Sequence, residues 1–150
     1  MLREIKAGEE ITIMYCDLLQ PQEARKEKLI QTHRFTCDCS LCTLPVTSVE
    51  TKNVNANRTL IKQTIAKLNS ASPERVGLNV LQKAVLAAEH EGLATYKAQL
   101  LYLGGAILLH GDRSQAVLAL SCLYQAKDLY QVLEGPDSFH VAELQKCIGR

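Results

Sequence analysis

The sequence has almost no excess of charge of either sign and no long apolar run. Its 17 lysine and arginine residues stand against 16 aspartate and glutamate residues, so the net charge is +1. This balance gives no reason to expect direct binding to nucleic acid or to an anionic membrane surface. No stretch approaches the roughly 20 apolar residues that cross a bilayer. We therefore expect no membrane contact.

A secretion signal is also missing. The first residues, MLREIKAGEEI, lack the apolar core of a signal peptide. Reduced thiols in the cytosol, the nucleus or both are therefore expected. Of the six cysteines, Cys122 and Cys147 lie among apolar neighbours in helical patterns, which is typical of small buried hydrophobic residues.

Helical periodicity dominates the chain from about residue 58 onward. Apolar residues recur at helical spacing, and glycine or proline separates the successive segments. Short connections favour antiparallel neighbours. The sequence therefore predicts a mainly α fold of repeat-like (tetratricopeptide-like) helical hairpins, although no clean repeat of ~34 residues is present. Gly104 and Gly105 each cost a helix roughly 1 kcal/mol relative to alanine; they indicate either close helix packing or a local kink.

The first third of the chain has a different character. Residues Gly8 to Tyr15, GEEITIMY, alternate as in a β-strand, yet no partner strand is apparent in the chain. Residues Gln20 to His33 predict a short charged helix, in which Arg25 to Lys28 (RKEK) form a solvated face. We expect four parts: a strand remnant at 1–17, a short helix with a cysteine segment at 18–45, a linker at 46–57, and a helical repeat-like domain at 58–150.

Three cysteines in C-x-C-x2-C spacing indicate a zinc site. Cys37, Cys39 and Cys42 are too closely spaced for a disulfide framework in a reducing compartment, and thiolates suit zinc. Structural zinc usually has four ligands. Cys16 and His33 are available as a fourth ligand, although neither has the spacing of a familiar zinc knuckle.

These residues together resemble a known family. The pattern runs G-E-E-I-T-x-x-Y, then a helix rich in arginine and lysine, then F-x-C-x-C-x2-C, all between Arg3 and Cys42. It is similar to the C-terminal end of a SET domain with its post-SET cysteine motif, as found in SET-and-MYND-like protein lysine methyltransferases and their fungal relatives. The helical remainder is more loosely similar to the C-terminal helical region of that group.

The resemblance implies roles for five residues. Tyr15 matches the active-site tyrosine beside the target lysine amine, and Phe35 matches the aromatic residue that packs against the adenine of S-adenosylmethionine. Cys37, Cys39 and Cys42 match the structural zinc ligands. Without the family pattern, Tyr15 reads as a solvated strand-end tyrosine and Phe35 as packing between the helix and the cysteine loop.

One element of the family pattern is missing from these 150 residues. The fourth zinc cysteine of the family lies in an upstream N-H-x-C segment, and the sequence contains no N-H-x-C. The chain is therefore expected to be a fragment, either a gene prediction that begins at an internal methionine or a deliberately shortened chain. By itself it is expected to be inactive and to bind zinc more weakly than a four-ligand site.

Two functional hypotheses follow. In the first, the chain is the C-terminal part of an S-adenosylmethionine-dependent protein-lysine methyltransferase, whose substrate is a lysine-containing protein. In the second, it is a non-enzymatic helical module with a small zinc appendage, which binds a peptide or protein on a concave face. Under either hypothesis, local disorder is expected in the first third, because an unpaired strand and an incomplete zinc site both lose stabilisation.

Overall fold

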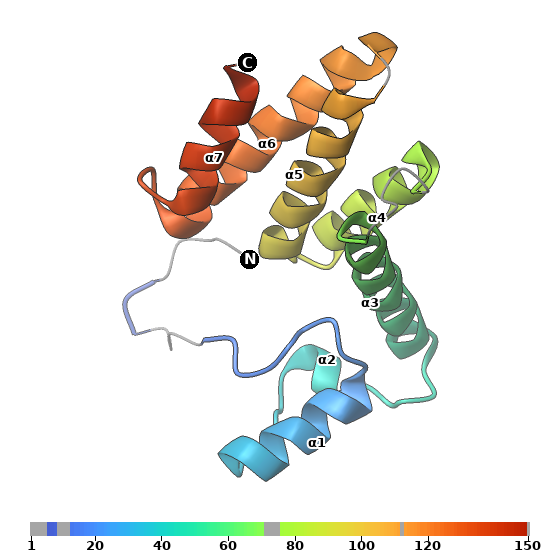
Figure 1. Ribbon diagram of the computed structural model, residues 1–150. Helices are drawn as coiled ribbons and strands as arrows, with labels where there is room; N and C mark the ends of the chain where they lie inside the picture. The colour runs from blue at the N-terminus through green and yellow to red at the C-terminus, as the bar shows by residue number, and fades with distance from the viewer. Residues whose placement is uncertain (1–5, 9–12, 71–75, 112, 150) are drawn as a thin grey trace.

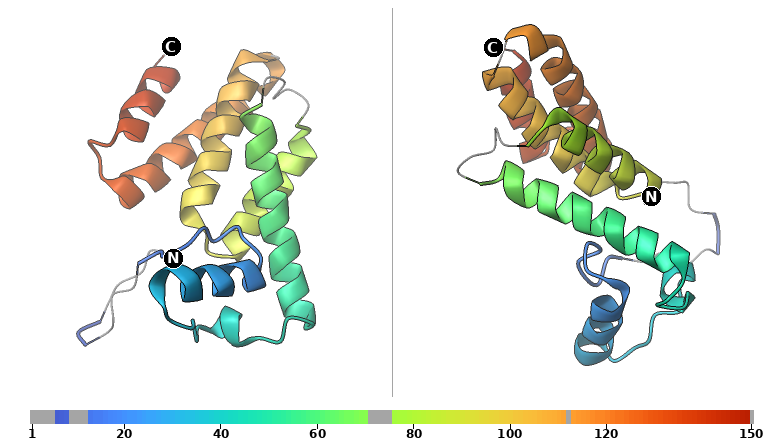
Figure 2. Two further views of the ribbon diagram at one scale, coloured as in Figure 1. Left: turned by 60° about the horizontal axis from the view of Figure 1, so that its bottom comes forward. Right: turned by 90° about the vertical axis from the view of Figure 1, so that its right-hand side faces the viewer.

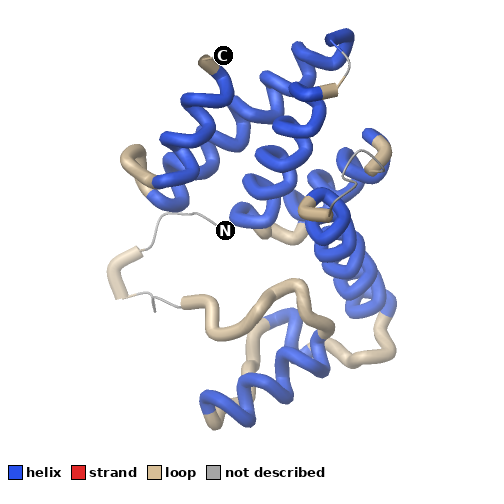
Figure 3. Tube along the Cα trace, in the orientation of Figure 1, coloured by secondary structure: helices blue, strands red, loops and turns tan. Residues whose placement is uncertain are grey.

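The computed structural model describes residues 6–8, 13–70, 76–111 and 113–149, and within them the protein is mainly helical (Figure 3). No strand occurs in these described parts. The helices are α1 (Gln22–His33), α2 (Ser40–Thr43), α3 (Val49–Leu68), α4 (Leu78–His90), α5 (Ala94–His110), a 3-10 turn (Arg113–Gln115), α6 (Ala116–Glu134) and α7 (Phe139–Ile148). No helix among the described residues has the length and apolarity that a membrane span requires.

The helices from α3 to α7, which we call the helical region, form one array in which each helix packs against the next. Figure 1 shows α1 and α2 beside one end of α3, remote from α6 and α7. The two other views in Figure 2 agree with this arrangement. The predicted mainly helical fold is thus confirmed, whereas the tetratricopeptide-like repeat stays a prediction.

Two apolar clusters hold this array, and α5 takes part in both. The first joins α3, α4 and α5 around the fully buried Ile61 and Leu100. The second joins α5, α6 and α7 around Leu123 and Leu144. Cys122 lies inside the second cluster and Cys147 packs against it, as expected for small apolar residues. A helix with apolar residues on all sides is typically buried between neighbouring helices. Helix α5 is such a helix, since it contributes to both clusters.

The glycine pair of α5 lies at close contacts with two neighbouring helices. A Cβ on Gly104 would lie 2.4 Å from Cδ2 of Leu81 in α4. A Cβ on Gly105 would lie 3.0 Å from Cδ2 of Leu123 in α6. The two glycines therefore face opposite neighbours, and close packing explains them better than a kink does.

One local expectation needs correction. The linker expected at 46–57 contains the start of α3, which begins at Val49 after the side chain of Ser48 caps its first turn. The polar, asparagine-rich composition suggested a loop, but burial of Thr51 and Arg58 along one face supports a helix there. The division into four parts stays a prediction.

Of the predicted strand, residues 9–12 lie outside the described residues, while Gly8 lies in a turn and residues 13–15 are irregular.

Candidate zinc and cofactor site

The three clustered cysteines converge in space. The sulfur atoms of Cys37, Cys39 and Cys42 all lie within 4.8 Å of one another. Cys39 is the N-cap of α2, and its carbonyl oxygen accepts the N–H groups of Cys42 (2.9 Å) and Thr43 (3.0 Å). This turn of four residues brings the third cysteine back onto the first two. Three soft sulfur donors within reach of one ion fit a zinc site.

The thiols differ in their readiness to ionise. Burial raises the pKa of Cys37 to about 11, and its side-chain hydrogen bonds to Cys39 and Cys42 act in the same direction. Burial also opposes ionisation of Cys39. However, the backbone N–H of Cys42 and the neighbouring thiols donate to the Cys39 sulfur, and together they lower its pKa. This environment thus favours the thiolate form, which binds a metal, at Cys39 over Cys37.

The two other candidate ligands lie outside the sulfur group. Among the described residues, neither Cys16 nor His33 belongs to it. The ring of His33 instead contacts the ring of Tyr15, with 5.2 Å between centroids, and lies 6.4 Å from the ring of Phe35. Cys16 lines the neighbouring cavity. The described chain therefore offers three sulfur ligands at one point.

A buried glutamine ties the cysteine loop to α1. Nε2 of Gln22 lies within hydrogen-bond distance of three carbonyl oxygens of the loop, those of Leu41 (2.8 Å), Cys42 (3.0 Å) and Leu44 (2.9 Å). Gln22 is 2% exposed. Its backbone N–H donates to Oδ1 of Asn55 in α3 at 3.3 Å. This residue was not predicted from the sequence, because a glutamine in a charged first helical turn carries no signal of burial.

Replacing Gln22 with leucine should destabilise the loop. The buried carbonyl oxygen of Cys42 and the part-buried ones of Leu41 and Leu44 would lose this donor, and an unsatisfied buried polar group costs roughly 1–3 kcal/mol. We expect a loss of that size in the free energy of unfolding in urea. Gln31→Leu is the matched control, since Gln31 is an exposed glutamine on the same helix. Equal stability of Q22L and Q31L would contradict the anchoring role.

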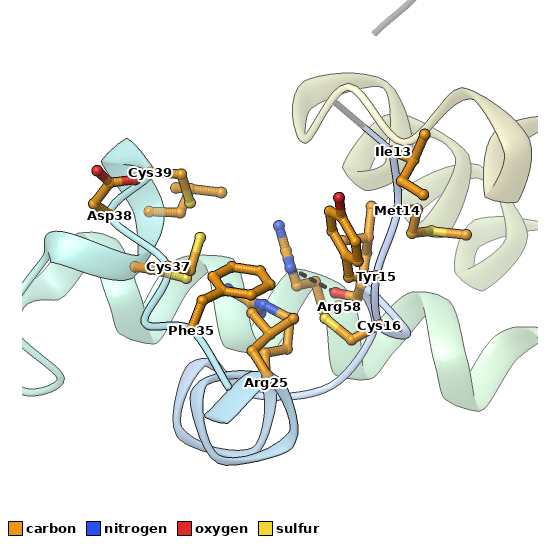
Figure 4. Close-up of a pocket in the computed structure, with 14 residues that line it drawn as sticks. Ile13, Met14, Tyr15, Cys16, Arg25, Phe35, Cys37, Asp38, Cys39 and Arg58 are labelled. Atoms are coloured by element: carbon orange, nitrogen blue, oxygen red, sulfur yellow. Dashed lines mark hydrogen bonds between the residues drawn. The ribbon is translucent and has the colours of Figure 1, made fainter. Parts of the chain in front are cut away.

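Tyr15 and Phe35 face one cavity beside the sulfur group. Their rings meet edge to face, with centroids 5.4 Å apart. The cavity measures about 550 Å³, and both rings, all three clustered cysteines and Cys16 line it. Figure 4 shows Tyr15 and Cys16 of the segment before α1, Phe35 of the segment after α1, and Cys37 and Cys39 of the cysteine loop lying around this cavity. The residues matched to the methyl-transfer site and to the zinc site thus share one pocket.

Two buried arginines complete the pocket wall. Arg25 of α1 and Arg58 of α3 are each 4% exposed, and both line the cavity (Figure 4). Arg25 donates to the carbonyl oxygen of Gln20 at 2.7 Å. Desolvation, together with the charge of Arg25, lowers the pKa of Arg58. The expectation of a solvated face over Arg25–Lys28 is therefore wrong for Arg25, because α1 turns that position toward α3 and the cysteine loop.

Comparisons with known proteins find several similar sequences. No family model matches the chain. Protein SET DOMAIN GROUP 41 of Arabidopsis thaliana is 49% identical over 41 residues, which is 27% of this chain and 7% of that protein. Human N-lysine methyltransferase SMYD2 is 48% identical over 42 residues, 28% of this chain and 10% of that protein.

One match extends through the helical region. Histone-lysine N-methyltransferase set5 of Schizosaccharomyces pombe is 29% identical over 157 aligned positions, which cover 98% of this chain and 46% of that protein. The chain thus spans less than half of the length of each of these relatives. The chain is thus similar to SET-domain lysine methyltransferases, and its three-cysteine cluster fits the post-SET zinc motif of that resemblance.

Proposed function

We propose that this chain forms the C-terminal wall of the active site of a protein-lysine methyltransferase that uses S-adenosylmethionine. The observation that carries the proposal is the shared cavity, where Tyr15, Phe35 and the three clustered cysteines meet. Relatives whose names state lysine methylation support the reaction class. The substrate would be a lysine side chain on another protein.

The resemblance suggests a role for each residue, and the shared cavity is compatible with it. S-adenosylmethionine supplies an electrophilic methyl group when bound. The hydroxyl of Tyr15 would hold the lysine amine in line for attack, since orientation within a fixed site lowers the barrier. Tyr15 is 47% exposed and Phe35 is 37% exposed. Phe35 is thus exposed enough for an adenine to pack against it, and its ring contacts the ring of Tyr15.

Cys37, Cys39 and Cys42 would hold a structural zinc ion. A metal bound at this point would fix the cysteine loop that follows Phe35, and so would stiffen one wall of the cavity. The described residues place three sulfur ligands there, and zinc takes four. We propose that the fourth ligand and the remaining cofactor contacts come from SET-domain segments that these 150 residues do not contain. The 150 residues alone are then inactive.

Calorimetry tests the inactivity of the isolated chain. Titration of the zinc-loaded 150-residue chain with S-adenosylmethionine should give no binding heat, because one wall cannot enclose the cofactor. A parallel assay with radiolabelled cofactor and lysine-containing peptides should give no methylated product. Measurable binding or transfer by the isolated chain would show that the proposed dependence on further segments is wrong. Transcript mapping upstream of Met1 then reveals whether an N-H-x-C segment is encoded in frame.

If such a segment is encoded, the longer protein tests the roles directly. Tyr15→Phe should lower the turnover number by about 100-fold, the size of effect that a misplaced reacting group causes, and should leave cofactor affinity unchanged. Phe35→Ala should instead weaken cofactor binding. Tyr124→Phe on α6 is the matched control, since Tyr124 is comparably exposed and remote from the cavity. Equal activity of Y15F and Y124F would contradict the assignment.

The helical region favours a second candidate function. Val117, Val132 and Phe139 of α6 and α7 are 66–82% exposed, and such apolar side chains can dock a peptide or protein partner. Absence of an upstream N-H-x-C in the transcript, combined with no cofactor binding, would favour this interaction module over the methyltransferase.

A further inference from the structure

The chain just after Tyr15 is held by the helical region. Oδ1 of Asp17 accepts the hydroxyl of Tyr96 in α5 at 3.0 Å, although 79 residues separate the two in sequence. The same oxygen accepts the backbone N–H of Leu19 at 2.9 Å. Burial, reinforced by the bond to Asp17, raises the pKa of Tyr96 to about 12. The phenol therefore stays protonated and able to donate.

A second contact reaches the next residue from α3. Nη1 of Arg58 donates to the backbone carbonyl oxygen of Leu18, 40 residues away in sequence. Nε of Arg58 pairs with the carboxylate of Glu91 at 3.8 Å, between two side chains that are each 4% exposed. Nδ2 of Asn57 donates to the other Glu91 oxygen at 2.9 Å. Arg58 is thus ion-paired with Glu91 on one side while its Nη1 donates to Leu18 on the other.

The third contact is apolar. Leu19 is 6% exposed and belongs to the cluster that α3, α4 and α5 form around Ile61 and Leu100. We refer to Asp17, Leu18 and Leu19, each with a different partner in the helical region, as the anchor. Tyr15 lies two residues before the anchor. The ring contacts of Tyr15 are with His33 and Phe35, which also lie outside the helical region.

We propose that the helical region positions the catalytic tyrosine: Tyr96 and Arg58 hold the anchor and thereby fix the backbone from which Tyr15 enters the cavity. This inference rests on the proposed function, because it gives Tyr15 a reason to be held. A group that orients a reacting amine must be fixed to within a fraction of an ångström. A half-exposed ring on an irregular segment meets that demand only if the adjoining backbone is tied down. Tyr96 and Arg58 are then positioning residues, whereas Tyr15 is the catalytic one.

Fluorine NMR of the 150-residue chain, labelled with 3-fluorotyrosine, measures whether the bond between Tyr96 and Asp17 affects the environment of Tyr15. The Tyr15 resonance is assigned by its loss in Tyr15→Phe. In Tyr96→Phe, which removes one hydroxyl, the Tyr15 resonance should shift or broaden. In Asp17→Ala it should change likewise, and Asp17→Asn should restore it because an amide oxygen still accepts from Tyr96. Tyr102→Phe is the control, since Tyr102 lies on the same helix against the other cluster.

Alkylation of Cys16 gives an independent readout. Trypsin cleavage after Lys6 and Arg25 yields a peptide whose single cysteine is Cys16, so mass spectrometry follows this thiol alone. Its reaction with iodoacetamide should accelerate about two- to tenfold in Y96F and D17A, the range that loss of one hydrogen bond allows. The rate should be unchanged in D17N and Y102F.

An unchanged Tyr15 resonance and an unchanged Cys16 rate in both Y96F and D17A would overturn the proposal. Equal effects of D17N and D17A would do so as well, because loss of the accepted bond would then not be the cause. Neither readout involves cofactor or methyl transfer. A failed anchor therefore leaves the proposed methyltransferase standing, and failed methyl transfer in the longer protein leaves the anchor standing.

Discussion

Arg58→Met is expected to lower the free energy of unfolding by about 3–5 kcal/mol, the cost of removing one member of a buried ion pair. Arg58 and Glu91 are each 4% exposed in their side chains. Without the guanidinium, the Glu91 carboxylate stays buried with the amide of Asn57 as its short-range donor. The carbonyl oxygen of Leu18 also loses the Arg58 donor. Urea unfolding followed by circular dichroism measures the change.

The double variant R58M/E91Q sharpens this test. Removing both charges leaves no uncompensated ion, so the double variant should be more stable than R58M alone. Arg113→Met provides the matched control, since Arg113 is an exposed arginine and its replacement should change stability by less than about 0.5 kcal/mol. A loss of under about 1 kcal/mol in R58M would mean that the pair is solvated and that the anchor has a weaker support than we infer.

Cys42→Ala is expected to lower zinc affinity by well over 100-fold. Loss of an outer-sphere partner alone typically costs about 10–100-fold, and Cys42 would be a direct ligand. Cys42 is also the buried member of the trio, 3% exposed, so water has poor access to replace its sulfur. Competition against a chromophoric chelator of known affinity measures the dissociation constant for each variant.

The remaining cysteines serve as controls for that measurement. Cys147→Ala should leave zinc affinity unchanged, because Cys147 packs against the α5–α7 cluster. Cys16→Ser should also leave it unchanged, since Cys16 lies outside the sulfur group. A fall in C16S as large as that in C42A would identify Cys16 as the fourth ligand and would contradict our proposal that this ligand lies beyond the 150 residues.

Periodic local signals predicted much of the helical architecture. The helix expected at 20–33 is α1 (Gln22–His33), and the glycine-bounded apolar segments became α4 to α7. Such signals work because the apolar residues of an amphipathic helix recur at helical spacing and so indicate which face is buried. The helix at residues 49–57 was not predicted in this way. It is stabilised by burial of Thr51 and Arg58 against other parts of the chain rather than by an apolar stripe.

From residue spacing alone, the candidate site was predictable only where its residues are near in sequence; Tyr15 and Phe35 were identified through the family resemblance. C-x-C-x2-C spacing brings three sulfur atoms together through one short turn, so the pattern alone indicated zinc. Gln22, Arg25 and Arg58 were missed because a polar residue that is buried by distant partners looks the same in sequence as a solvated one. Tyr96 was missed for the same reason, as its partner Asp17 lies 79 residues away.

By itself, the sequence determined a mainly helical chain with a trio of thiols and a resemblance to SET-domain methyltransferases. Tertiary structure alone decided that Tyr15 and Phe35 meet at the cavity beside those thiols, and that α3 and α5 hold the backbone after Tyr15. The physical reason is the distance along the sequence between the residues that interact. Helix periodicity and short metal-ligand spacing depend on neighbours within a few residues, whereas buried hydrogen bonds such as those of Arg58 and Tyr96 exist only after distant segments have packed.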